Sequence, residues 1–278
     1  MHAGWNLLAR YDRSEGEFYK KMLMITLIVG FLPAVISEIR TGSMTPLAWV
    51  CVIGSAICAA FYLFGLARAF DQSDFTIVYP VARALPVILI ALIDVLRGRH
   101  LSPFGWVGIC LVVIGSALEP QQRFGDFRVR NYYNSALLWM VIAALGTVGY
   151  TLLDKIAAEV VQSGPGTAAR YGYFYFAISF FPYMLLMRQQ STTHENKRNP
   201  GWKLPIIGAI FGFSAYWLIL WAYQLSPYAS YIVAFRQFSI VIGAGLAFLI
   251  YKERGLAVRI SGALLITAGL VFIGLWGR

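Results

Sequence analysis

Apolar blocks of about twenty residues recur along the whole chain, and this recurrence constrains its fold more than any other feature. A helix needs about 20 mostly apolar residues to cross a bilayer, so each block is predicted to be a membrane-spanning helix. The predicted spans are 20–37, 46–68, 75–96, 101–118, 134–154, 170–188, 203–224, 229–251 and 256–276, and a shorter apolar piece, 1–9, precedes them. Only 13% of the residues are charged, against roughly 25% in soluble domains. We therefore expect an all-α membrane protein.

The net charge of +10 raises the question of a nucleic-acid partner. The basic residues lie in the loops between predicted helices rather than on one soluble face, which is typical of membrane proteins. We expect the lipid bilayer as a partner and no nucleic acid. The three cysteines fall within predicted spans and form no CxxC or His/Cys cluster, so neither a metal site nor a cofactor is expected.

The chain contains an internal duplication. Residues of the first half recur 153 positions later, with Trp49, Ala69, Ser73 and Arg83 matching Trp202, Ala222, Ser226 and Arg236. After a slip of one residue, Gly108 and Gly115 match Gly262 and Gly269. The N-terminal piece follows the same pattern, since Gly4 to Arg10 aligns with Gly149 to Lys155.

Each copy then holds five helices, and an odd number makes the two copies run in opposite directions through the membrane. This inverted-repeat design is common among secondary transporters. We predict one transmembrane domain over 1–278, a ten-helix bundle with repeat one at about 1–119 and repeat two at about 134–278. Because the first helix is about a dozen residues shorter than its counterpart, we expect it to be truncated by a translation start placed too late.

Two arginines lie inside predicted spans at equivalent places of the two repeats. Arg83 lies within 75–93 and Arg236 within 228–242. An intramembrane arginine costs roughly 2.5 to 3.5 kcal/mol on insertion scales and usually faces a bundle interior or a wet cavity. A guanidinium binds carboxylate or phosphate through two parallel hydrogen bonds. The structural alternative is that each arginine holds helices together, with Arg83 bound to carbonyls or to Asp94.

The predicted substrate-binding set extends beyond the arginines to neighbouring polar and aromatic side chains. It comprises Arg83, Tyr79, Arg236, Gln237, Trp5, Asn6 and His2. His2 and Asn6 share one helix face, and His2 could relay protons or simply be hydrogen-bonded near the chain terminus. No predicted span places an acid at its centre, since Glu38, Asp94, Asp154 and Glu253 fall near predicted ends. An anionic or zwitterionic solute is therefore favoured over a lipophilic cation.

At these residues the chain resembles the EamA-like transporters of the drug/metabolite transporter superfamily. The matching pieces are His2 to Asn6, Pro80 to Pro86, Gly105 to Ile109 with Gly115, Ser226 to Gln237, Lys252 to Arg254 and Gly262 to Ile266. The resemblance implies a ten-helix bundle with a central cavity that carries small metabolites or drugs across a cytoplasmic membrane. One departure is Gly98-Arg99, where relatives often have Gly-Glu.

The distribution of basic residues predicts a membrane orientation. Loops after odd-numbered helices hold fifteen Lys and Arg, and the opposite face holds six. The positive-inside rule therefore places the C-terminus outside, whereas the family resemblance implies a C-terminus inside.

The leading functional prediction is a multi-pass secondary transporter of the inner cell membrane, working by alternating access. A lipid-linked substrate flippase or a non-transporting sensor with the same fold stays open. An enzyme is not expected, because the chain carries no HExxH, Ser/His or nucleotide-binding glycine motif. The expected partners are a small-molecule substrate and the bilayer, with room for proton or ion coupling and for a monomer or a homodimer.

Overall fold

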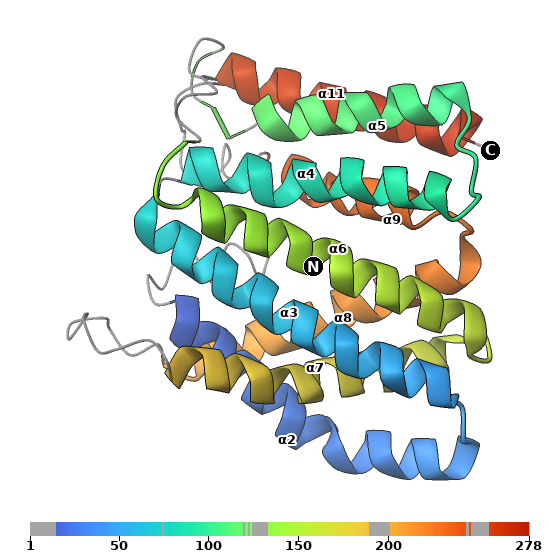
Figure 1. Ribbon diagram of the computed structural model, residues 1–278. Helices are drawn as coiled ribbons and strands as arrows, with labels where there is room; N and C mark the ends of the chain where they lie inside the picture. The colour runs from blue at the N-terminus through green and yellow to red at the C-terminus, as the bar shows by residue number, and fades with distance from the viewer. Residues whose placement is uncertain are drawn as a thin grey trace. The chain divides into compact units, whose positions relative to one another are not determined.

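The chain was analysed as a computed structural model that describes residues 15–73, 75–118, 120–121, 123, 133–188, 201–242, 245 and 256–277. Within these residues all regular secondary structure is helical (Figure 1). The helices are α2 (Glu15–Thr41), α3 (Pro46–Gln72), α4 (Phe75–Leu96), α5 (Pro103–Leu118), α6 (Leu137–Val160), α7 (Pro165–Arg188), α8 (Lys203–Leu225), α9 (Ala229–Arg236) and α11 (Leu256–Trp276). The N-terminal piece 1–9 and its predicted truncation lie outside the described residues.

Within the described residues, each predicted span falls mainly on a helix. In the described part, five helices are long and apolar enough to cross a membrane by length and composition. They are Gly16–Thr41, Pro46–Gln72, Leu137–Val160, Lys203–Leu225 and Ala257–Trp276. The prediction of an all-α membrane fold is confirmed at this level.

The predicted end of the 134–154 span is too early, because α6 continues to Val160. Hydropathy marks where apolar residues stop, whereas a helix continues through charged residues of high helix propensity such as lysine, alanine and glutamate. Lys155 and Glu159, four residues apart, form an ion pair of 3.3 Å in this extension. Asp154 thus lies inside a helix, and its assignment to a helix end is wrong.

In the described part of the predicted span 229–251, the apolar helix runs over residues 229–242 and tightens at Gln237, directly after α9, where the backbone keeps helical angles (φ −68°, ψ −15°). Gln237 is a turn residue: its N–H donates to the carbonyl of Ala234 (2.9 Å), and its own carbonyl accepts from the N–H of Ile240 (2.8 Å). The other arginine-bearing helix, α4, runs through Pro80 and Pro86 as one element. The tightened turn therefore falls beside Arg236.

The chain divides into two compact units. Unit 1 comprises 1–67 and 149–227, and unit 2 comprises 68–148 and 228–278. Each unit combines a segment of the first predicted repeat with a segment of the second. Helices α3 and α6 each contribute residues to both units.

In unit 1, α2 packs against α7 and α8. The closest approach is at Gly30, where a Cβ atom would lie 2.5 Å from the ring of Tyr173. The Tyr173 hydroxyl donates to the carbonyl of Leu27, at 3.1 Å. Glycine at position 30 lets the tyrosine ring lie directly against the α2 backbone.

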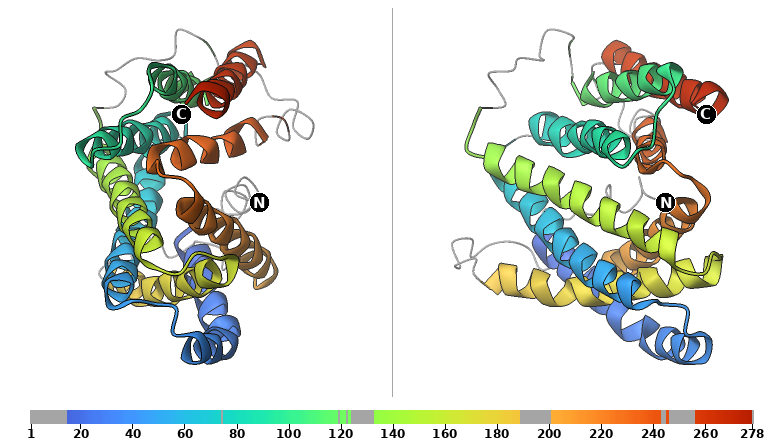
Figure 2. Two further views of the ribbon diagram at one scale, coloured as in Figure 1. Left: turned by 90° about the vertical axis from the view of Figure 1, so that its right-hand side faces the viewer. Right: turned by 45° about the vertical axis from the view of Figure 1, so that its right-hand side comes forward.

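In unit 2, α5 and α11 lie side by side (Figures 1 and 2). A Cβ at Gly108 would lie 2.7 Å from the carbonyl oxygen of Gly269, and a Cβ at Gly269 would lie 2.5 Å from that of Gly108. A Cβ at Gly115 would lie 2.6 Å from the carbonyl oxygen of Gly262. The early glycine of each helix thus faces the late glycine of the other, and the two helices are antiparallel. Small residues permit such close backbone contact in a membrane.

Candidate functional site

The two arginine-bearing segments meet in unit 2. Arg83 is buried, with 8% of its surface exposed, and Gln237 is 2% exposed. The side-chain nitrogen Nε2 of Gln237 donates to the backbone carbonyl of Arg83, at 3.1 Å. Because Gln237 directly follows Arg236, this hydrogen bond brings equivalent points of the two predicted repeats together.

Two buried polar oxygens without partners lie two residues apart in the chain, just after Arg236. Within the described residues, Gln237 Oε1 and Ser239 Oγ are buried and have no hydrogen-bond partner. A buried polar group left unsatisfied costs about 1–3 kcal/mol, and such groups are normally satisfied by protein or water. Gln237 is tied to the Arg83 backbone through its other side-chain atom, Nε2, so its free acceptor Oε1 belongs to the segment that meets α4.

The remaining predicted binding residues are not all described. His2, Trp5 and Asn6 lie outside the described residues, so their association with the arginines stays a prediction. Tyr79 belongs to α4, but its side chain also lies outside the described part.

Asp94 has a different role from the one considered from the sequence. Its carboxylate accepts hydrogen bonds from the backbone N–H of Ser230 (2.8 Å) and from the Ser230 hydroxyl (2.6 Å). Asp94 is 1% exposed. A carboxylate at a helix N-terminus satisfies free N–H groups and opposes the helix dipole. Asp94 therefore secures the start of α9, the helix that ends at Arg236.

Sequence reasoning missed a polar cluster in unit 1. Asp154 of α6 is 1% exposed, and its carboxylate accepts hydrogen bonds from three hydroxyls on three helices. The donors are Ser55 of α3 (2.5 Å), Tyr171 of α7 (2.8 Å) and Tyr216 of α8. A signal was available, because Thr147 and Thr151 precede Asp154 at helical spacing and mark a polar face.

Lys155 is one of the six basic residues that the sequence assigns to the less basic loop face, and this assignment is wrong. Its side chain is buried in unit 1, and its ammonium donates to the carbonyls of Tyr223 (2.9 Å) and Ser226 (2.7 Å). These carbonyls belong to the C-terminal end of α8, where cations are favoured. Lys155 therefore fixes the α8 end instead of marking a membrane face.

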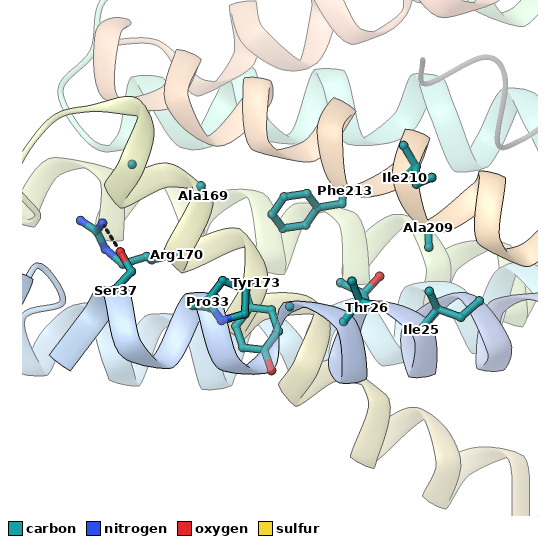
Figure 3. A pocket seen from close by; sticks show the side chains of 14 residues that line it. Ile25, Thr26, Pro33, Ser37, Ala169, Arg170, Tyr173, Ala209, Ile210 and Phe213 are labelled. Atoms are coloured by element: carbon teal, nitrogen blue, oxygen red, sulfur yellow. Dashed lines mark hydrogen bonds between the residues drawn. The ribbon is translucent and has the colours of Figure 1, made fainter. Parts of the chain in front are cut away.

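A groove of about 480 Å³ lies in unit 1 along α2, α7 and α8 (Figure 3). At one end the Arg170 guanidinium donates to the Ser37 hydroxyl, at 3.1 Å, and Ile25 and Thr26 lie further along α2. Arg170 also bonds the hydroxyls of Ser43 and Thr167 and pairs with Glu38. Since the rest of the lining is almost entirely apolar, the groove suits an apolar occupant better than an anion.

Comparison with known proteins identifies the chain's relatives. The model of the EamA-like transporter family, part of the drug/metabolite transporter superfamily, matches residues 134–275. No curated protein matches the chain. A solved structure titled "Crystal structure of protein" has the same fold, with a TM-score of 0.71 and 14% sequence identity over 100% of this chain and 94% of that one. The chain belongs to the EamA-like transporter family, whose members are membrane transporters of small solutes.

Proposed function

We propose that the chain is a secondary carrier of the inner cell membrane that moves a small anionic or zwitterionic solute by alternating access. The observation that carries this proposal is the buried contact between Gln237 and Arg83, with the unfilled acceptor Gln237 Oε1 beside it. Buried polar groups at membrane depth are expensive and mark substrate pathways.

The chemistry of this set favours a solute with separated polar groups. A guanidinium presents a planar fork of donors that suits a carboxylate or a phosphate. Gln237 Oε1 and Ser239 Oγ accept hydrogen bonds from an ammonium or a hydroxyl. An amino acid or a hydroxy acid offers both an anionic group for the guanidinium and a hydrogen-bond donor for the two oxygens. A lipophilic cation offers no anionic group.

Two features support alternating access between inverted repeats. The reciprocal contacts of Gly108 with Gly269 and of Gly115 with Gly262 are those expected of two copies related by a twofold axis. The second feature is a local tightening of the helix over residues 229–242 at Gln237, a member of the proposed binding set, since irregular helices at the binding site are common in secondary transporters.

The test is a comparison of export profiles. Cells with and without the chain are grown on an amino-acid-rich medium, and extracellular metabolites are measured by mass spectrometry. We expect Arg83→Ala to reduce the chain-dependent export of the affected solutes at least tenfold, which corresponds to about 1.4 kcal/mol. Arg83→Lys should recover only part of this export, because lysine lacks the planar fork.

Arg68→Ala is the matched control, since Arg68 belongs to the same unit and lies over the ring of Trp139, 5.3 Å from its centroid. Membrane abundance of each variant is measured by immunoblot. If the Arg83→Ala variant is as abundant in the membrane as the natural chain and exports the same solutes, Arg83 does not belong to the binding set. If the extracellular metabolites are the same with and without the natural chain, the carrier function itself is overturned.

A further inference from the structure

Asp154 lies at the junction of four helices of unit 1. Its partners Ser55, Tyr171 and Tyr216 come from α3, α7 and α8, and Asp154 itself comes from α6. The carboxylate is 1% exposed, and Ser55 is 0% exposed. Three hydroxyl donors on one buried carboxylate form a site whose hydrogen bonds depend on whether that carboxylate carries a proton.

Ser55 provides the means to accommodate both forms. Its hydroxyl oxygen lies 2.5 Å from Asp154 Oδ1 and 3.4 Å from the backbone carbonyl of Tyr150. The single hydroxyl hydrogen can point to only one of these acceptors. With Asp154 ionised, Ser55 donates to the carboxylate. With Asp154 protonated, Ser55 can donate to the Tyr150 carbonyl and accept the Asp154 hydrogen.

A further acceptor lies one turn earlier on the same helix. Thr151 is 0% exposed, and its Oγ1 has no hydrogen-bond partner within the described residues. Residues three apart on a helix share a face. The face of α6 that carries Asp154 thus has hydrogen-bonding capacity that the present arrangement leaves unused.

Other titratable and charged groups surround the carboxylate. From α3, Cys51 and Cys58 interact with Asp154 electrostatically. From α6, Lys155 follows Asp154 in the chain and is engaged with the α8 carbonyls and with Glu159. The remaining neighbours are tyrosines: the Tyr175 and Tyr216 rings stack at 4.5 Å, and both contact Tyr150 at 6.1 Å. Tyr223 also interacts with Tyr216.

We propose that Asp154 is a proton-exchange site, and that its protonation couples proton movement to solute transport. A hydronium ion gives its proton to a carboxylate oxygen of Asp154, leaving water and a carboxylic acid, and the reverse step returns the proton to water. Asp154 lies six residues before the end of α6, about 9 Å along the helix axis. Each change redirects the Ser55 hydroxyl and so alters the contact between α3 and α6. The coupling part rests on the proposed carrier function.

The primary test does not depend on any substrate. The purified full chain, reconstituted in lipid, is examined by infrared difference spectroscopy between pH 8 and pH 5. We expect a carboxylic-acid C=O band that grows on acidification and disappears in Asp154→Asn. Asp94→Asn, which changes the other described buried aspartate, should leave the band in place. If no pH-dependent band is lost with Asp154→Asn, the proton-exchange site is overturned.

The coupling is tested by flux. Vesicles holding the full chain are loaded with a mixture of radiolabelled amino acids, and efflux is measured with and without an inwardly directed proton gradient. We expect the gradient to accelerate efflux at least threefold in the natural chain and to have no effect in Asp154→Asn. Ser55→Ala should keep the infrared band and lose most of the acceleration, because the hydroxyl that changes partner is absent.

The outcomes separate the two proposals. Efflux that Arg83→Ala abolishes, but that no gradient changes, leaves the carrier intact and overturns coupling. A pH-dependent Asp154 band without amino-acid efflux from the natural chain supports the proton site and counts against amino acids as the solute. Loss of all efflux in Asp154→Asn, with Arg83→Ala unaffected, would move solute binding to Asp154 and overturn the assignment to Arg83.

Discussion

At the scale of single residues, a poorly exposed charge in this chain is stabilised where the fold gives it several hydrogen-bond or ion-pair partners. Glu38 shows this clearly, because its carboxylate pairs with Arg170 (3.1 Å) and accepts from the Ser43 hydroxyl and the Met44 backbone N–H. The Glu38 and Arg170 side chains are 12% and 13% exposed. Breaking a buried pair by removing one partner typically costs about 3–5 kcal/mol, because the other charge stays buried.

We expect Glu38→Gln to lower the thermal unfolding midpoint of the detergent-solubilised chain by several degrees. Glutamine keeps the shape of glutamate but leaves the Arg170 charge uncompensated. The control is Glu17→Gln, since Glu17 and Lys20 form a pair of 3.3 Å whose side chains are 44% and 34% exposed, and exposed pairs contribute about 0–1 kcal/mol. Tryptophan fluorescence during heating measures both variants. Equal midpoints would mean that the Glu38 pair contributes no more than a surface pair.

The residue scale also shows how far a sequence leads toward the site. Arg83 was predicted as intramembrane from its apolar surroundings, and it is buried. Gln237 donates a hydrogen bond to Arg83 only because α4 and the segment after α9 meet in the fold. The two residues are 154 positions apart in the chain, so the sequence does not reveal this contact. Asp154 was missed because a hydropathy window ends at the first charge, although the helix continues.

At the scale of helices, the crossing of α5 and α11 depends on the absence of side chains. A Cβ atom added at Gly269 would lie 2.5–3.0 Å from three atoms of α5. These are the carbonyl oxygen of Gly108, a side-chain atom of Val112 and the Cβ of Leu111. Two of these atoms cannot rotate away, since they are a backbone oxygen and a Cβ. A methyl group at this position must separate the helices.

We expect Gly269→Ala to destabilise the chain by about 1–3 kcal/mol, the usual cost of overpacking. Gly274→Ala, on the same helix, is the matched control, because its Cβ would meet only a Phe235 ring atom at 3.8 Å. Alanine has a higher helix propensity than glycine by about 1 kcal/mol, so this variant should be as stable as the natural chain or slightly more stable. Denaturant unfolding in detergent distinguishes them. A Gly269→Ala chain as stable as Gly274→Ala would contradict the tight crossing.

Helix positions were largely predictable from the sequence, and the local tightening of a helix was not. Twenty-residue apolar blocks locate the spans because the bilayer imposes one thickness on all of them. The tightened turn at Gln237 lies within an apolar run, and neither glycine nor proline marks it in the sequence. Pro80 and Pro86, by contrast, lie within the continuous α4.

At the scale of the whole molecule, the basic residues predict orientation. The positive-inside rule places the C-terminus outside, since the loops after odd-numbered helices carry most of the Lys and Arg. Lys155 belongs to the smaller group of six, yet it is buried in unit 1 and is not a loop charge. Arg68 and Arg259, from the larger group of fifteen, likewise lie within α3 and α11, so the larger group still holds most of the loop charges.

We expect a reporter that is active only in the cytoplasm to be inactive when fused after Arg278. The same reporter inserted after Arg188, at the end of α7, should be active, because that loop belongs to the basic face. Equal protein levels on an immunoblot are the control. An active C-terminal fusion with an inactive insertion after Arg188 would reverse the orientation and favour the one that the family resemblance implies.

The chain passes from one compact unit to the other at three points, and two of these lie inside helices. The boundaries fall between Ala67 and Arg68 in α3 and between Val148 and Gly149 in α6. Continuous helices, and not loops, therefore connect the units at these two points. Gly65, Gly146 and Gly149 lie within a few residues of the boundaries, and glycine is the residue at which a helix bends most readily. In the proposed carrier, stiffening the helices at these glycines should slow transport without weakening solute binding.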